Sequence, residues 1–163
     1  MTSTTTPRTT SELQTARPGN GAGNLKGKET KMGDNYSVSL ELKCKDEARV
    51  ASLLKGYIRK NPENAEFKLR KWKRQGVGTE TVEDLVTIML AGWEGQRIRK
   101  EAKPNGVTSY HNCFSCSYGW RRVMTGMFFA MADALDDESG IIISGDSCIE
   151  EFIIEDGEAT QIR

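Results

Sequence analysis

The stretch Tyr36–Lys43, with the sequence YSVSLELK, alternates strictly between apolar and polar residues. Its apolar members are Tyr36, Val38, Leu40 and Leu42, and its polar members are Ser37, Ser39, Glu41 and Lys43. Successive side chains of a strand point to opposite faces of a sheet. The alternation therefore predicts a half-buried strand, in a sheet with one face against the core and one polar face.

Three segments outside this strand have apolar residues at the three- and four-residue spacing of an amphipathic helix. Asp46 can open the first helix, and Asn61–Pro62 ends it, because a residue before proline is disfavoured in helices. Thr81 and Asp84 resemble a capping box at the start of the second helix. The third helix follows Gly119. The apolar positions that define the three helices are Val50, Leu53, Leu54, Tyr57 and Ile58; Val82, Leu85, Val86, Met89, Leu90 and Trp93; and Trp120, Val123, Met124, Met127, Phe128, Met131 and Leu135.

Residues 63–75 allow two interpretations. Phe67 and Leu69 alternate with lysines and arginines as in an edge strand, and this pattern slightly favours a strand. Asn61 as N-cap, followed by Pro62 at the first helical position, favours a helix instead. The sequence leaves both open.

Most of the second half of the chain is predicted to be extended. Residues 107–118, Ile141–Ser144 (a buried-type strand), Cys148–Glu155 and Thr160–Ile162 fit strands, with a turn at Pro104–Asn105–Gly106 and a hairpin at Asp156–Gly157. The segment Arg97–Lys103 is polar and basic. Together these elements predict an α+β fold, with about three helices on one face of a mainly antiparallel sheet and a C-terminal β-meander.

The composition predicts one domain behind a tail. Residues 1–34 are rich in Thr, Gly and Pro and poor in large apolar residues, so we expect a disordered tail, followed by a single domain at 35–163. No apolar stretch is long enough for a membrane span or a secretory signal, so a cytoplasmic location is expected. The four cysteines, Cys44, Cys113, Cys116 and Cys148, are then expected to be reduced.

The formal net charge is zero, but the charged residues are unevenly distributed along the chain. Residues 1–132 hold 22 basic and 13 acidic residues, a net charge of +9, whereas residues 133–163 hold 1 basic and 10 acidic residues, a net charge of −9. Such a split can mark binding faces. Alternatively, the basic and acidic segments are neighbours in the fold and neutralise each other.

His111, Cys113 and Cys116 are soft metal ligands within six residues. In one continuous strand, however, Cys113 and Cys116 lie on opposite faces. The sequence therefore predicts no metal, no redox pair and no cofactor, with these three residues as minor candidates.

Cys116 and Arg122 have the spacing C-x5-R between a predicted strand and a predicted helix. This resembles the phosphate-binding loop of the cysteine-dependent protein tyrosine phosphatases. The resemblance implies Cys116 as a nucleophile and Arg122 as a phosphate ligand. It covers seven residues, and it departs from the family at Ser115 and Val123, where the family usually has His and Ser or Thr. Arg121 and Arg122 at a helix start can also bind an anion without catalysis.

Two charged segments are candidate binding surfaces. Basic residues interleaved with an aromatic ring can follow a nucleic-acid backbone, and the set here is Lys68, Arg70, Lys71, Trp72, Lys73 and Arg74. An acidic face can bind a basic partner, and its members are Asp146, Glu150, Glu151, Glu155, Asp156 and Glu158.

The joint Ser117–Tyr118–Gly119–Trp120 and the Asp-Gly hairpin, in a small domain, resemble uncharacterised accessory proteins of phages and mobile elements. This implies no functional residues. The leading hypothesis is a non-enzymatic protein that binds a macromolecular partner through polarised basic and acidic faces, such as a phage-type accessory or counter-defence (anti-CRISPR-like) protein. The partner is expected to be a protein, for example a nucleic-acid-binding one. The alternatives are a cysteine phosphatase and a nucleic-acid-binding module; no membrane partner is expected.

Overall fold

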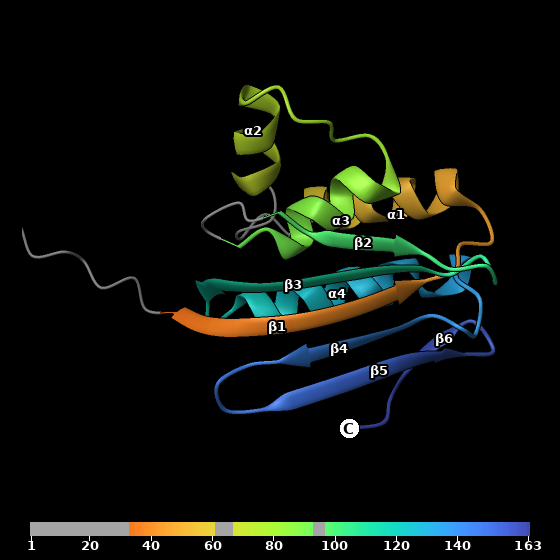
Figure 1. Cartoon of the computed structure of the whole chain (residues 1–163). Coiled ribbons are helices and arrows are strands. Elements are labelled where there is room, and N and C mark those ends of the chain that lie inside the picture. The colour runs from red at the N-terminus through yellow and green to blue at the C-terminus, as the bar shows by residue number, and fades with distance from the viewer. Residues whose placement is uncertain (1–32, 61–66, 93–96) are drawn as a thin grey trace, which may run out of the picture. The chain divides into compact units, whose positions relative to one another are not determined.

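The computed structural model describes residues 33–60, 67–92 and 97–163 (Figure 1). Six strands form one antiparallel sheet in the order β2–β3–β1–β4–β5–β6. The strands are β1 Gly33–Leu42, β2 Arg99–Ala102, β3 Thr108–Ser117, β4 Gly140–Ser144, β5 Ile149–Glu155 and β6 Glu158–Gln161. The tail predicted at 1–34 lies outside the described residues, except for Gly33 and Asp34, which begin β1.

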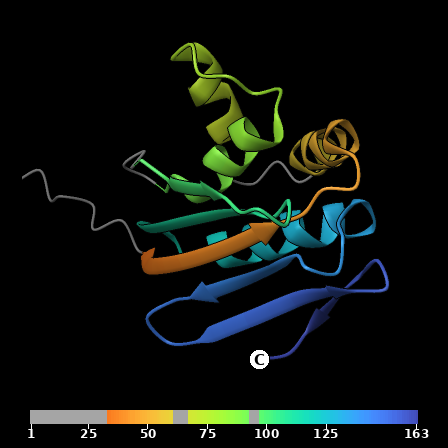
Figure 2. The same cartoon turned by 45° about the vertical axis from the view of Figure 1, so that its right-hand side comes forward.

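The helices lie on one side of this sheet (Figures 1 and 2). They are α1 Glu47–Lys60, α2 Phe67–Arg74, α3 Val82–Leu90 and α4 Trp120–Met131, with a 3-10 turn at Ala132–Ala134. Helix α4 packs against α1 and α3, and α2 packs against α3. The predicted α+β class and the meander β4–β5–β6 are therefore confirmed.

The alternation of β1 is confirmed. Tyr36, Val38, Leu40 and Leu42 are at most 2% exposed and belong to the core. Residues of the neighbouring strands that face the same way are also buried: Tyr110, Asn112, Phe114, Cys116, Ile141, Ile143, Phe152 and Ile154. Asn112, a polar member of this set, donates from Nδ2 to the carbonyl oxygen of Leu90 at 2.8 Å. The core thus fills the space between one sheet face and the helices.

The preference for a strand within residues 63–75 was wrong, because residues 67–74 form helix α2. Leu69 is buried and Trp72 packs against the core, and residues three apart share one helix face. Residues 63–66 lie outside the described part of the chain.

The polar segment Arg97–Lys103 contains a strand that the sequence analysis did not predict. All four residues of β2 are exposed, so no apolar alternation marks it. β2 pairs with β3 across the predicted turn, where the Lys103 N–H donates to the Val107 carbonyl at 2.8 Å. The predicted hairpin between β5 and β6 is also present, with positive φ at Asp156 (52°) and Gly157 (80°), as a tight primed turn requires.

The capping box of α3 is confirmed. The Asp84 N–H donates to Thr81 Oγ1 at 3.1 Å, and the Thr81 N–H donates to the Asp84 carboxylate at 3.0 Å. Burial alone would raise the pKa of Asp84, but hydrogen bonds from the Thr81 and Glu80 N–H groups and the Thr81 side chain lower it overall.

We expect Thr81→Ala to lower the free energy of unfolding by about 1 kcal/mol. Because the pKa of Asp84 is lowered by folding, its contribution is present above the unfolded pKa and is lost as the pH falls through the folded pKa. The stability difference between wild type and Asp84→Asn should therefore shrink below about pH 4. Urea unfolding at pH 7 and pH 3 measures both effects, and a difference that grows in acid would contradict this account.

Candidate functional site: the uncovered face of the sheet

The second face of the sheet is covered by none of the described helices. Along β1 and β3, every residue that points away from the core is half-buried or exposed. We call the side chains on this side the uncovered face. By register they are Arg99, Glu101, Asn35, Ser37, Ser39, Glu41, Ser109, His111, Cys113, Ser115, Ile142, Ser144, Ile149, Glu151, Ile153, Glu155, Glu158 and Thr160.

The β1–β3 half of the uncovered face is rich in small polar side chains that bond to one another. Ser115 Oγ donates to Asn35 Oδ1 at 2.7 Å, and the Cys113 thiol lies 3.6 Å from Ser37 Oγ. A hollow of about 440 Å³ lies over this end of the sheet, bordered by the loop residue Asp146. This half therefore offers hydrogen-bonding groups to a partner.

The β4–β5 half differs because it exposes isoleucines. Ile142 is 41% exposed and Ile149 is 44% exposed. Ile162, 52% exposed, follows β6 and is joined to Glu151 by a 2.9 Å hydrogen bond from its N–H to the Glu151 carbonyl. With the half-buried Ile153 on the same strand face, these four residues form what we call the isoleucine patch. Neighbouring exposed apolar side chains of this kind mark interaction sites more often than isolated ones do.

Glutamates lie within and beside the isoleucine patch. By register Glu151 is at the middle of the patch, between Ile142 and Ile162, and Glu155 and Glu158 lie at one end of it. Glu151 lies opposite Ile142 in the β4–β5 ladder, and Glu155 lies opposite Glu158 in the β5–β6 ladder. Within the described part of the chain, these three carboxylates make no side-chain hydrogen bond or ion pair; we call them the acidic rim. Like charges directly opposite each other destabilise a sheet. The Glu155–Glu158 pair is therefore not explained by the stability of the fold.

A hollow of about 310 Å³ continues the acidic rim toward β1, where Gly140 contributes no side chain. Two carboxylates at its edge are neutralised: Glu41 by Lys103 and Glu138 by Lys43. These contacts lower the pKa of both carboxyls, with the hydrogen bond from the lysine as the largest cause in each case. The carboxylate of Asp137 also lines this hollow, so the hollow can still accept a cationic group.

The structure separates the three minor candidates for metal ligands. His111 and Cys113 lie together on the uncovered face, with 3.9 Å between Nε2 and Sγ. Cys116 is 1% exposed and belongs to the core on the other face. Among the described residues, no group of three or more His, Cys, Asp or Glu side chains is placed to hold a metal ion. The four cysteines are free thiols.

The C-x5-R pair does not form a pocket of the kind that the phosphatase resemblance implies. Cys116 is buried in the core, whereas Arg122 is exposed on α4. Arg121 contacts the Cys148 thiol and lies 3.5 Å from the carboxylate of Glu150, which is the largest cause of its raised pKa. Because Cys116 is buried and Arg122 is exposed, the two side chains do not share a site open to phosphate, and Arg121 already has partners.

The basic stretch lies on α2, where Arg70, Lys73 and Arg74 are exposed and Lys71 is half-buried. The side chain of Lys68 is not among the described parts of the structure. Trp72 is half-buried and packs against the core, so only part of its ring is exposed. Helix α2 therefore offers exposed charge with limited aromatic surface.

The acidic candidates do not share one surface. Glu150 points to the helix side and pairs with Arg121, whereas the acidic rim is on the uncovered face. Asp146 and Asp156 lie in the loops at opposite ends of β5. Among the described residues, three ion pairs join the acidic segment 133–163 to the rest of the chain: Lys43–Glu138, Arg49–Asp133 and Arg121–Glu150. Part of the charge split is therefore neutralised within the fold.

Comparison of the chain with protein families, with curated proteins and with solved structures found no match. None of the helices in the described ranges is long and apolar enough to cross a membrane. The function is therefore inferred from the geometry of the site alone.

The isoleucine patch was missed by the sequence analysis, which treated Ile141–Ser144 as a buried strand. Only alternate residues are buried: Ile141 is 1% exposed, whereas Ile142 is 41% exposed. A run of apolar residues does not show which of its members face the core. The sequence of β5 contains a pattern that predicts the patch. Its outward residues, Ile149, Glu151, Ile153 and Glu155, alternate with the buried Phe152 and Ile154.

Proposed function

We propose that this protein is a binding protein that holds a partner protein on the isoleucine patch and the acidic rim. The observation that carries the proposal is the set of isoleucines exposed on the uncovered face beside glutamates without cationic partners. The fold does not require these side chains there. Protein interfaces commonly combine exposed apolar side chains with polar and charged groups.

The acidic rim specifies the chemistry of the partner. Complementary charges speed association and exclude partners of the wrong sign. We therefore infer a partner segment that carries apolar side chains for the isoleucines and lysines or arginines for Glu151, Glu155 and Glu158. A basic protein, such as one that binds nucleic acids, has this chemistry. Occupying the basic surface of such a protein would suit a phage-type counter-defence role.

A photo-crosslinking residue placed at Ile142 of the full chain, expressed in cells, tests this function. We expect one discrete adduct with a basic protein. The yield should fall about tenfold or more when Glu151, Glu155 and Glu158 are changed to lysine, and less when they are changed to glutamine.

The matched control carries the same crosslinker at Ser52, which is exposed on α1 on the helix side. The proposal fails if Ser52 gives the same adduct in similar yield, or if the lysine substitutions leave the Ile142 adduct unchanged. An adduct to RNA or DNA would also overturn it and favour the nucleic-acid hypothesis.

A further inference from the structure

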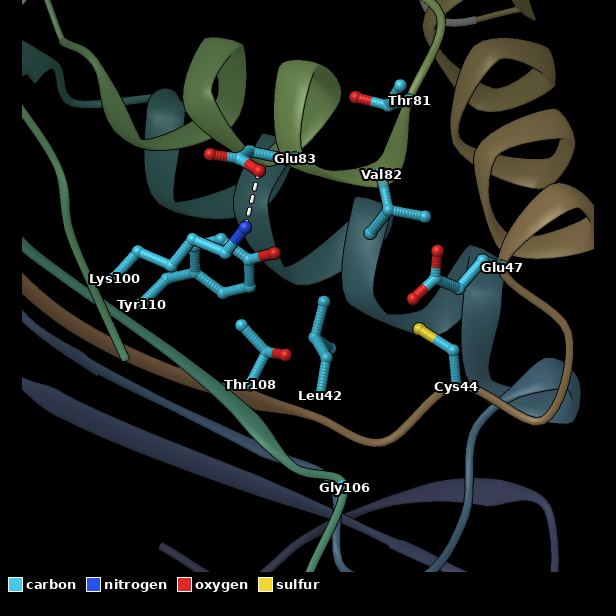
Figure 3. A pocket seen from close by; sticks show the side chains of 10 residues that line it. All are labelled: Leu42, Cys44, Glu47, Thr81, Val82, Glu83, Lys100, Gly106, Thr108 and Tyr110. Atoms are coloured by element: carbon cyan, nitrogen blue, oxygen red, sulfur yellow. Dashed lines mark hydrogen bonds and ion pairs between the residues drawn. The ribbon is translucent and has the colours of Figure 1, made fainter. Parts of the chain in front are cut away.

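A second site lies away from the uncovered face, where the first turns of α1 and α3 approach the β2–β3 hairpin. This cavity has a volume of about 310 Å³. Figure 3 shows side chains from all these elements pointing into it, among them Glu47, Val82, Lys100 and Tyr110. We propose that this cavity binds a primary ammonium group on a short alkyl stem.

The first observation is the hydroxyl of Tyr110. The residue is only 5% exposed, yet its hydroxyl points into the cavity (Figure 3) and makes no hydrogen bond to any described residue. The hydroxyl oxygen is accessible at the wall of the cavity, so water or a ligand can hydrogen-bond to it there. An ammonium group is a donor for the lone pairs of this oxygen.

The second observation is the charge of the lining. Glu47 and Glu83 contribute two carboxylates, and Lys100 contributes one ammonium group, which pairs with Glu83 (dashed line in Figure 3). Glu47 has no hydrogen bond or ion pair with the described residues. Its carboxylate is therefore available to a cation.

The two helix N-termini do not reverse this charge. A helix N-terminus carries a partial positive charge that attracts anions. In α1 the Asp46 carboxylate accepts from the Arg49 N–H at 3.1 Å, and in α3 the Asp84 carboxylate closes the capping box. Because these caps supply negative charge at both ends, the cavity favours a cation over an anion.

The remaining polar groups stay neutral at physiological pH. Burial, with further contributions from Glu47 and Asp136, raises the pKa of the Cys44 thiol to about 11. Burial and the charges of Glu83, Cys44 and Glu47 raise the pKa of Tyr110 to about 12. Neither group adds charge near pH 7, so the carboxylates of Glu47 and Glu83 and the ammonium of Lys100 set the electrostatics.

Two apolar side chains, Leu42 and Val82, lie among the mostly polar groups of the lining. The volume of about 310 Å³ is at the lower end of the range for ligand pockets, which begins near roughly 300 Å³. A stem of about four carbons fits this size. The ammonium can come from a lysine side chain of a partner protein or from a free alkylamine.

Titration of the full chain with n-butylammonium chloride, followed by NMR, tests the site. We expect saturable shifts at Tyr110 and Val82, and none with n-butanol, which has the same stem without the charge. Glu47→Gln should weaken binding by about two- to fivefold, as expected for the loss of an exposed ion pair. Glu101→Gln, whose exposed side chain lies on the opposite face of the sheet from the cavity, is the matched control and should leave the affinity unchanged.

Two further ligands distinguish the sources of the ammonium. Tighter binding of N-acetyl-lysine methylamide than of 1,4-diaminobutane indicates a lysine side chain, and the reverse order indicates a free amine. The proposal is overturned if no saturable shift occurs, if n-butanol binds equally well, or if Glu47→Gln binds as the wild type does. Because Glu47 is on the protein surface, this variant should fold normally.

Discussion

Replacing Trp120 by alanine should lower the free energy of unfolding by about 3–5 kcal/mol, the range for deleting a large buried ring. Trp120 is fully buried at the start of α4. Its Nε1 donates to the carbonyl oxygen of Met89 at 2.8 Å, which connects α4 to α3. A small domain has a total stability of roughly 5–15 kcal/mol. The loss should therefore leave a marginally stable protein, measured by circular dichroism in urea.

Two further variants test this account: one separates the contribution of the Trp120 ring from that of its hydrogen bond, and the other removes a less buried tryptophan for comparison. Trp120→Phe keeps an aromatic ring but leaves the Met89 carbonyl without this donor, and its cost should be about 1–3 kcal/mol. Trp72→Ala removes a half-buried ring on α2 and should cost less than Trp120→Ala. If the Trp72 variant were the more damaging of the two alanine variants, the assigned position of α4 in the core would be wrong.

The same substitution to alanine should lower the free energy of unfolding strongly at Ile141 and only slightly at the neighbouring Ile142. Ile141→Ala removes a side chain that is 1% exposed and should cost about 2–5 kcal/mol. Ile142→Ala changes a side chain that is 41% exposed, and its effect on stability should stay within about 0.5 kcal/mol. Urea unfolding of the two variants under the same conditions measures the difference.

The same pair links stability to binding. Ile142→Ala removes part of the isoleucine patch and should reduce crosslinking from a probe at Ile149, while the protein remains folded. Equal destabilisation by the two substitutions would show that Ile142 is buried as well, which would remove the basis for the patch. Unchanged crosslinking in a folded Ile142→Ala variant would remove Ile142 from the interface.

The best-predicted parts of the fold were those in which one local pattern controls burial. The alternation from Tyr36 to Lys43 defined β1 and its two faces. The capping box at Thr81 and the Asp156–Gly157 turn also depend on neighbouring residues only, so the sequence was sufficient for both.

The parts that were missed depend on tertiary contacts. Strand β2 is exposed at all four residues, and only its pairing with β3 makes it a strand. Helix α2 packs through Leu69 and Trp72 against the core, and this contact outweighs the local alternation. The isoleucine patch depends on strand register, and the ammonium cavity is assembled from α1, α3 and the β2–β3 hairpin. None of these neighbours is visible in the sequence.

The most direct test of the uncovered face is solvent paramagnetic relaxation of the isoleucine methyl groups. With an inert soluble gadolinium chelate, the free protein should show strong relaxation at Ile142, Ile149 and Ile162, and weak relaxation at the buried Ile141, Ile143 and Ile154. Adding the partner captured through Ile142 should protect the first set and leave the exposed surface of α1 unchanged. Protection of Ile142 in the free protein, or protection of α1 in place of the isoleucine patch in the complex, would contradict the account.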